Sequence, residues 1–160
     1  MTRPIQYYIR QQRGFRTLEE EVFVGLQLAA DRLMAPWERT LRERADLTPV
    51  QYNVLRILRG AGAEGLWAGE IAARLIARSP DVTRLVDRLE KRGLVSRCRD
   101  AVDGRAVRVH ITAAGLERIG PLDEHVRTEL HDVLGGLGEA RLATLKDALE
   151  AVLASVESRS

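Results

Sequence analysis

Residues 78–111 contain the pattern that most constrains how this chain can fold. They read RSPDVTRLVDRLEKRGLVSRCRDAVDGRAVRVHI, which predicts a short basic helix, a glycine that ends it, and two strands joined by a charged turn. Nine basic and five acidic residues give this window a net charge of +4, whereas the whole chain has +2. Positive charge is therefore concentrated here, as expected for a surface that contacts a polyanion, duplex DNA above all.

The first part of the window predicts a capped amphipathic helix over residues 79–92. Ser79 and Pro80 suit an N-cap and a first helical position, and Asp81 then complements the helix dipole at the second. One face is apolar and should be buried, which leaves a polar arc outside. The residues that we expect to contact DNA from this helix are Ser79, Pro80, Asp81, Thr83, Arg84, Arg88 and Lys91.

Within that arc, Arg84 is expected to read a base, because arginine can bind a guanine edge with two hydrogen bonds. Thr83 and Arg88 suit flanking bases or phosphates. Asp87 is expected to hold Arg84 or Lys91, each about one helical turn away. The alternative is a solvated amphipathic helix with ordinary intrahelical ion pairs.

The second part of the window predicts a basic hairpin, with strands over 94–98 and 106–111. Arg105 lies at its tip, where a guanidinium can enter a minor groove, and Arg99 is a further DNA-contact candidate. Asp100 and Asp103 are expected to orient Arg97, Arg99 or Arg105 through charge-assisted hydrogen bonds. The alternative is a polar hairpin tip with no DNA contact.

The rest of the chain predicts five more helices. Capping signals open helices at Thr17 and Thr48, and we expect these to run to about Arg44 and to Gly60. A short helix over 68–76 precedes the basic one, which completes a winged helix-turn-helix. Thr112 caps a helix bent at Pro121, and a last helix follows over 139–158. Residues 1–16 read as a polar arm.

These elements predict a mostly α fold with a small β-wing, flanked by long N- and C-terminal helices. We divide the chain into an arm and first dimerisation helix (1–46), a DNA-binding domain (47–112) and C-terminal dimerisation helices (113–160). The long helices have apolar stripes that the compact winged module is too small to cover. We therefore expect a homodimer, whose two-fold symmetry would place two reading helices about 34 Å apart on the duplex.

Composition excludes several other classes. The chain is 45% hydrophobic and 30% charged, as in folded soluble proteins, and its 4% aromatic content does not favour base stacking on single strands. Without a signal-peptide core or a membrane-length apolar stretch, we expect a cytoplasmic protein with no membrane partner. We find no phosphate loop, nucleophile arrangement or metal-ligand spacing, so neither an enzyme nor a cofactor is expected.

The single cysteine and the histidines do not change this expectation. Cys98 cannot form an intrachain disulfide, and a small packed or half-exposed residue is favoured over a redox sensor. His110, His125 and His131 are too scattered for an obvious metal site. His125 and Glu129 share a helix face, which we interpret as a solvated pair.

From Leu47 to Gly115 the chain resembles the MarR (multiple antibiotic resistance regulator) family. The resemblance rests on the segments LTPVQYNVLRIL, GEIAARL and VTRLVDRLEKRGLVSR, the D-x-x-D-x-R wing and the helix start ITAAG. It implies a homodimeric winged-helix transcription factor on a pseudo-palindromic operator, with residues 79–92 as recognition helix and Arg105 in the minor groove. It also implies release by a small, often phenolic, effector bound between the dimerisation and DNA-binding parts. The pocket candidates are Trp37, Tyr52, Arg56 and Trp67, most of which are equally well explained as core.

The sequence therefore predicts a dimeric, sequence-specific DNA-binding regulator, acting as a repressor that a small molecule releases. Two alternatives stay open: a winged-helix protein–protein adaptor and a non-specific architectural DNA-binding protein. An adaptor would need an apolar patch on its reading face, whereas Arg84, Arg88 and Lys91 are charged.

Overall fold

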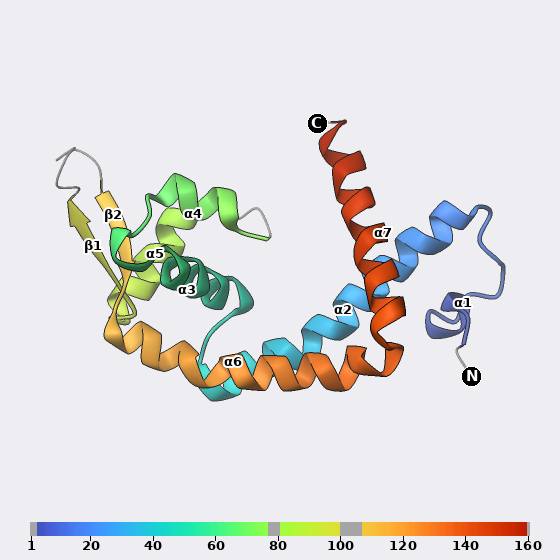
Figure 1. The fold of residues 1–160 in the computed structure, drawn as a ribbon, viewed down its shortest axis with the longest axis horizontal. Helices are drawn as coiled ribbons and strands as arrows, with labels where there is room; N and C mark the ends of the chain where they lie inside the picture. The colour runs from blue at the N-terminus through green and yellow to red at the C-terminus, as the bar shows by residue number, and fades with distance from the viewer. Residues whose placement is uncertain (1–2, 77–80, 100–106, 160) are drawn as a thin grey trace.

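The computed structural model describes residues 3–76, 81–99 and 107–159. It confirms a mostly helical fold with a two-stranded wing (Figure 1). The helices are α1 (Ile5–Tyr8), α2 (Leu18–Ala45), α3 (Pro49–Ala61), α4 (Ala68–Arg74), α5 (Val82–Lys91), α6 (Ala113–Leu134) and α7 (Glu139–Glu157). The strands are β1 (Val95–Arg99) and β2 (Val107–Ile111), and 3-10 turns occupy Gly62–Glu64 and Gly135–Leu137. Within the described ranges no helix is long and apolar enough to span a bilayer.

Threonines begin helices α2, α3 and α6, as the sequence predicts. The hydroxyl oxygens of Thr17, Thr48 and Thr112 each accept a hydrogen bond from the backbone N–H three residues later. At α3 the cap is reciprocal, since the Gln51 side chain accepts from the Thr48 N–H at 2.9 Å. These bonds satisfy N–H groups that a helix start leaves unpaired, and so they set where each helix begins.

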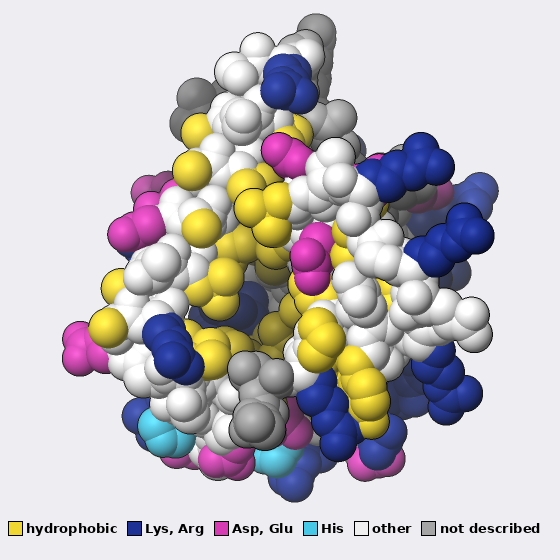
Figure 2. Space-filling view, turned by 90° about the vertical axis from the view of Figure 1, so that its right-hand side faces the viewer, with side chains coloured by type: hydrophobic (Ala, Val, Ile, Leu, Met, Phe, Trp, Pro, Cys, Tyr) yellow, Lys and Arg dark blue, Asp and Glu magenta, His cyan; other side chains and the backbone are white. Residues whose placement is uncertain are grey.

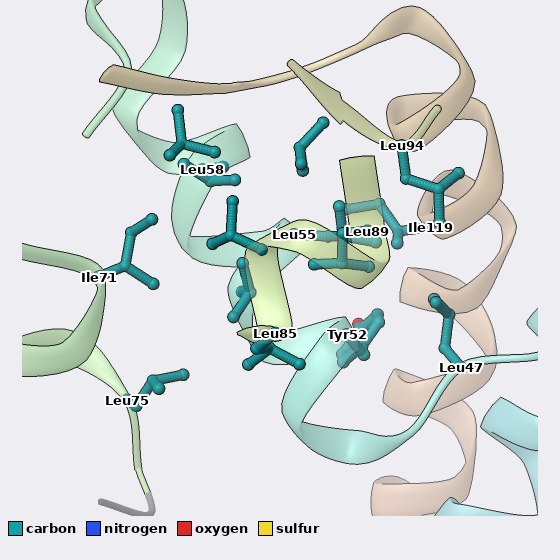
Figure 3. Packing of buried hydrophobic residues seen from close by; sticks show 14 of the residues in the cluster. Leu47, Tyr52, Leu55, Leu58, Ile71, Leu75, Leu85, Leu89, Leu94 and Ile119 are labelled. Atoms are coloured by element: carbon teal, nitrogen blue, oxygen red, sulfur yellow. The ribbon is translucent and has the colours of Figure 1, made fainter. Parts of the chain in front are cut away.

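One hydrophobic core holds the winged module together (Figure 3). Leu55 and Leu58 from α3, Ile71 from α4 and Leu89 from α5 are fully buried in it, together with Ile119 from α6. The apolar face of α5 packs inward as predicted, because Val82, Leu85, Val86 and Leu89 are all buried. This burial leaves the opposite arc of α5 facing solvent.

The wing is an antiparallel pair that a third segment extends. Arg97 of β1 pairs with Val109 of β2, and Val109 also forms a bridge with Leu66. Gly65, just before this bridge, has φ +61°, and a Cβ there would lie 2.7 Å from the Val109 carbonyl oxygen. Only glycine tolerates both conditions, so it permits the close approach of the segment before α4 to β2.

The long helices extend away from the winged module and leave apolar side chains exposed. In Figure 1 the wing lies at the left, whereas α7, α1 and the start of α2 lie at the right. Figure 2 shows that right-hand side, where hydrophobic side chains gather along a hollowed face. The large exposed apolar residues of α2 and α7 are Leu18, Val22, Phe23, Met34, Leu145, Leu149, Val152, Leu153 and Val156.

Several local predictions need correction. Asp81 is the N-cap of α5, not its second helical residue: its carboxylate accepts from the Arg84 N–H at 2.9 Å. The helix α3 continues past Gly60 and ends beside Gly62, which has φ +62°. The predicted helix over 68–76 ends at Arg74. The arm contains the short helix α1, which the sequence pattern did not predict.

Candidate nucleic-acid interface

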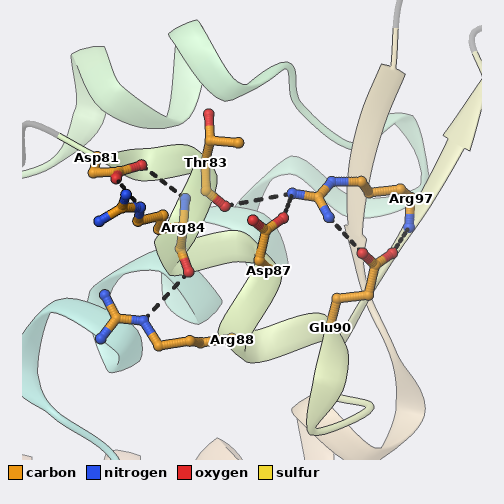
Figure 4. Close-up of polar contacts among 7 residues, drawn as sticks. All are labelled: Asp81, Thr83, Arg84, Asp87, Arg88, Glu90 and Arg97. Atoms are coloured by element: carbon orange, nitrogen blue, oxygen red, sulfur yellow. Dashed lines mark hydrogen bonds and ion pairs between the residues drawn. The ribbon is translucent and has the colours of Figure 1, made fainter.

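Figure 4 shows the predicted DNA-contact residues Thr83, Arg84 and Arg88 on α5, with Asp81 at its start. Thr83, Arg84, Arg88 and Lys91 are all exposed, and Arg99 is exposed at the end of β1. Arg84 has a side chain that is 80% exposed, and its Nε lies 2.9 Å from Asp81 Oδ2. Arg88 donates from Nε to the Arg84 carbonyl oxygen at 3.3 Å. The arc therefore presents several exposed cations to solvent.

The prediction that Asp87 binds Arg84 or Lys91 is wrong. Its Oδ1 lies 2.5 Å from Nη2 of Arg97, on the neighbouring strand β1. Glu90 binds the same guanidinium at 2.5 Å through Nη1 and accepts the Arg97 backbone N–H at 3.1 Å. Arg97 is thus oriented by two carboxylates of α5. The alternation of side chains along β1 could have indicated that Arg97 points toward α5 rather than solvent, because Arg97 lies on the same strand face as the buried Val95.

The guanidinium of Arg97 is partly withdrawn from water. Its side chain is 27% exposed, and burial by itself would lower its pKa. The hydrogen bonds to Asp87 and Glu90 outweigh burial and hold the pKa of Arg97 above its ordinary value. Arg97 therefore remains a cation that the protein itself has already paired.

Three of the predicted DNA-contact residues lie outside the described part of the chain. These are Ser79 and Pro80, which precede α5 in the sequence, and Arg105, which lies between β1 and β2 in the sequence. The expected orienting residues Asp100 and Asp103 lie outside it as well. The assignments made to these five residues remain predictions.

A second cluster forms where α2, α3 and α6 meet, and it contains three of the four pocket candidates. The rings of Trp37 and Tyr52 contact edge to face, with centroids 5.0 Å apart. The guanidinium carbon of Arg56 lies 5.7 Å from the centroid of the Tyr52 ring. Trp67 lies elsewhere, at the start of α4, where Arg108 of β2 stacks on it at 4.8 Å.

Sequence reasoning missed two further members of this cluster, Arg59 and Asp123. Asp123 of α6 accepts two hydrogen bonds from Arg59 of α3, at 2.6 and 3.1 Å. It also accepts the Tyr52 hydroxyl at 3.5 Å. The Arg59 guanidinium holds the pKa of Asp123 below its usual range, whereas burial raises the pKa of Tyr52. No local pattern links α3 to α6, because these residues are 64 positions apart.

The pair formed by His125 and Glu129 is less solvated than expected. His125 Nε2 lies 3.2 Å from Glu129 Oε1, and the two side chains are 29% and 32% exposed. Glu129 also accepts the Thr40 hydroxyl at 3.0 Å, which joins α6 to α2. The described residues include no group of three or more histidine, cysteine and acidic side chains placed to hold a metal ion.

A capped, arginine-bearing helix beside a two-stranded wing defines a winged helix-turn-helix DNA-binding protein. Comparisons with known proteins narrow the class. A model of the MarR family matches residues 45–106. The transcriptional repressor IacR of Pseudomonas putida is 31% identical over 140 residues, which cover 88% of this chain and 82% of IacR.

Solved structures agree with this sequence match. A MarR transcription factor from Planctomyces limnophilus has a TM-score of 0.62 and 38% identity, over 86% of this chain and 99% of that one. NadR in complex with 4-hydroxyphenylacetate has a TM-score of 0.66 and 28% identity, over 88% of this chain and 97% of NadR. The chain belongs to the MarR family of winged-helix, DNA-binding transcriptional regulators.

Proposed function

We propose that this chain is a homodimeric, sequence-specific repressor that leaves a pseudo-palindromic operator when a small aromatic anion binds. The exposed cationic arc of α5 is the observation that carries the DNA-binding part of the proposal. An adaptor that bound another protein there would need an apolar patch. Thr83, Arg84, Arg88 and Lys91 instead offer hydrogen-bond donors and positive charge.

In the proposed complex, α5 enters the major groove with its N-terminal end towards the base edges. Arg84 reads a base, and Thr83 and Arg88 contact flanking bases or phosphates. Asp81 supports this arrangement, since it caps α5 and pairs with Arg84 at the same time. Arg99 and Lys91 add phosphate contacts, and Arg105 at the wing tip enters the minor groove.

The exposed apolar faces of α2 and α7 support the homodimer. Phe23 and Leu153 are 62% and 63% exposed in the single chain, within a larger set of exposed apolar residues. A face of this kind is stable in water when it is covered, and a two-fold copy presents a self-complementary apolar surface. We therefore propose residues 1–46 and 113–160 as the dimerisation elements and 47–112 as the DNA-binding domain.

Selection of bound sequences from a randomised duplex pool, followed by fluorescence anisotropy at two salt concentrations, tests this proposal. We expect enrichment of a pseudo-palindrome whose half-sites lie one helical turn apart. Tight, salt-steep binding without enrichment would indicate an architectural protein instead. Absence of binding would favour an adaptor. Sedimentation of the same sample shows whether the dimer is the species that binds.

The cluster of Trp37, Tyr52 and Arg56 is the proposed effector site. Arg59 is occupied by Asp123, whereas Arg56 extends over the Tyr52 ring and places a cation beside two aromatic rings. That combination suits an aromatic ligand with a carboxylate. The NadR complex with 4-hydroxyphenylacetate supports the same ligand class. Trp67 does not join this cluster, so we leave it out of the proposed site.

Trp37 is a convenient reporter, because the chain has only two tryptophans and Trp67→Phe leaves it alone. We expect 4-hydroxyphenylacetate to change Trp37 fluorescence and to lower affinity for the selected duplex. The neutral analogue 4-(2-hydroxyethyl)phenol, which lacks the carboxylate, serves as the matched control. Arg56→Gln should remove the response to the acid. Equal responses to both compounds would contradict the role given to Arg56.

A further inference from the structure

A single side chain, Arg97, ties the wing strand β1 to the polar face of α5. Its guanidinium contacts Asp87 and Glu90 at 2.5 Å each, and Nη2 also donates to the Thr83 carbonyl oxygen at 3.5 Å. Its backbone N–H donates to Glu90 as well. Figure 4 shows these contacts along α5 on the side that faces Arg97. Arg97 of the wing therefore contacts α5 near its start, in its middle and near its end, at Thr83, Asp87 and Glu90.

The acidic side chains of α5 would affect the binding of a polyanion such as DNA. Asp87 and Glu90 are the two acidic residues within α5, and both are partly exposed. Asp87 lies one turn beyond Thr83 and Arg84, close to the side chains that we place at the DNA. An unpaired carboxylate there would repel phosphates, because like charges at an interface are strongly unfavourable. Arg97 supplies the positive charge that pairs with both.

We propose that Arg97 is a positioning residue: it sets the wing against the recognition helix α5, so that both contact one duplex in a fixed relative geometry. This inference rests on the proposed function, in which α5 reads bases and the wing contacts the backbone. The fork of five N–H donors in arginine suits the role, since it can bond to two carboxylates in a fixed plane. Arg97 does not need to touch DNA in this role.

Hydrogen exchange tests the positioning role without DNA. Arg97→Met keeps the length and apolar stem of the side chain but removes the guanidinium. We expect faster exchange of the β1 amides, most of all at residue 97, whose N–H donates to Glu90. Arg99→Met is the matched control, with the same charge lost from the same strand at an exposed position. Equal exchange in the two variants would overturn the proposal.

Binding to the duplex selected with the wild-type protein, and to a random duplex of equal length, gives the second test. We expect Arg97→Met to weaken binding to the selected duplex by about tenfold or more, well beyond the effect of Arg99→Met. Asp87→Asn and Glu90→Gln, added to Arg97→Met, should restore affinity for the random duplex, because the repelling charges are then gone. Arg97→Met should lose its preference for the selected duplex over the random one. The triple variant Arg97→Met, Asp87→Asn, Glu90→Gln should not regain that preference, because its wing is still not held against α5.

Arg97→Lys completes the set, since it keeps the charge but cannot form both carboxylate contacts in one plane. We expect it to regain affinity for random duplex and only part of the sequence preference. A triple variant with wild-type preference would overturn positioning and leave charge neutralisation alone. If the wild-type protein selected no duplex, the proposed function would fail, while the exchange comparison would still decide whether Arg97 fixes the wing.

Discussion

Replacing Arg84 by alanine removes the side chain that we propose as the base reader. In the structure the cap of α5 does not depend on that side chain, because Asp81 accepts from the Arg84 backbone N–H at 2.9 Å. The change also deletes one exposed ion pair, which typically contributes about 0–1 kcal/mol. Alanine is a better helix former than arginine. We therefore expect the free energy of unfolding to stay within about 0.5 kcal/mol of wild type.

The effect on DNA should be larger. A bidentate arginine–guanine contact contributes about 1–3 kcal/mol of discrimination, which corresponds to about 5- to 150-fold in affinity. Asp81 binds Arg84 through Nε in an exposed ion pair that contributes about 0–1 kcal/mol, so the expected loss stays within that range. Arg84→Ala should lose affinity for the selected duplex and also lose preference at one base pair of each half-site.

Anisotropy titrations against the selected duplex and its single-base variants measure both quantities. Arg88→Ala is the matched control, because it removes the same charge one turn further along α5. As a phosphate contact, Arg88 should affect all duplexes equally and lower the salt slope by about one. An Arg84→Ala protein with wild-type affinity and wild-type base preference would refute the assignment of Arg84.

Three further predictions concern the scaffold. Leu89→Ala, in the fully buried face of α5, should lower the free energy of unfolding by about 2–5 kcal/mol in urea titrations, and a loss below 1 kcal/mol would contradict the packing described. Gly65→Ala should cost at least about 1–2 kcal/mol in thermal unfolding, since it combines positive φ with a close contact to Val109, whereas Gly69→Ala, in open space, should not. The pKa of Asp123 is lowered in the folded state, so its pair with Arg59 stabilises the protein above the ordinary value of 3.8 and loses that effect as pH falls through the folded pKa. Unfolding measured from pH 6 to pH 3 should therefore be less acid-sensitive in Asp123→Asn, and identical profiles would show that the pair contributes nothing.

Contacts between residues close in the chain were the predictable part of this fold. The threonine caps of α2, α3 and α6 need only a hydroxyl and a backbone N–H three residues later. The buried face of α5 follows from a period of 3.6 residues. The start of α5 was predicted wrongly: Ser79 was expected as the N-cap and Asp81 inside the helix. Asp81 is the N-cap instead, and its non-helical backbone conformation is visible only in the structure.

Partner choice among charged residues could not be predicted in the same way. The pattern offered Arg84 and Lys91 as partners of Asp87, because both lie within one turn on the same helix. The fold instead brings Arg97 of β1 within 2.5 Å of it. Likewise, Asp46, at the end of α2, binds Arg92, at the end of α5, at 2.9 Å, although 46 positions separate them. Long side chains have many possible partners, and packing selects among them.

The amino-acid order alone thus determined most of the elements, the threonine caps of α2, α3 and α6, the inward face of α5 and its outward arginines, because periodicity and capping act over a few residues. Only the tertiary structure decided that Arg97 is paired with α5, that Trp67 lies beside β2 rather than with Trp37, and that Asp123 binds Arg59. These contacts form between elements far apart in the chain. Their geometry is set by how the buried apolar faces pack, and that packing is a property of the whole fold.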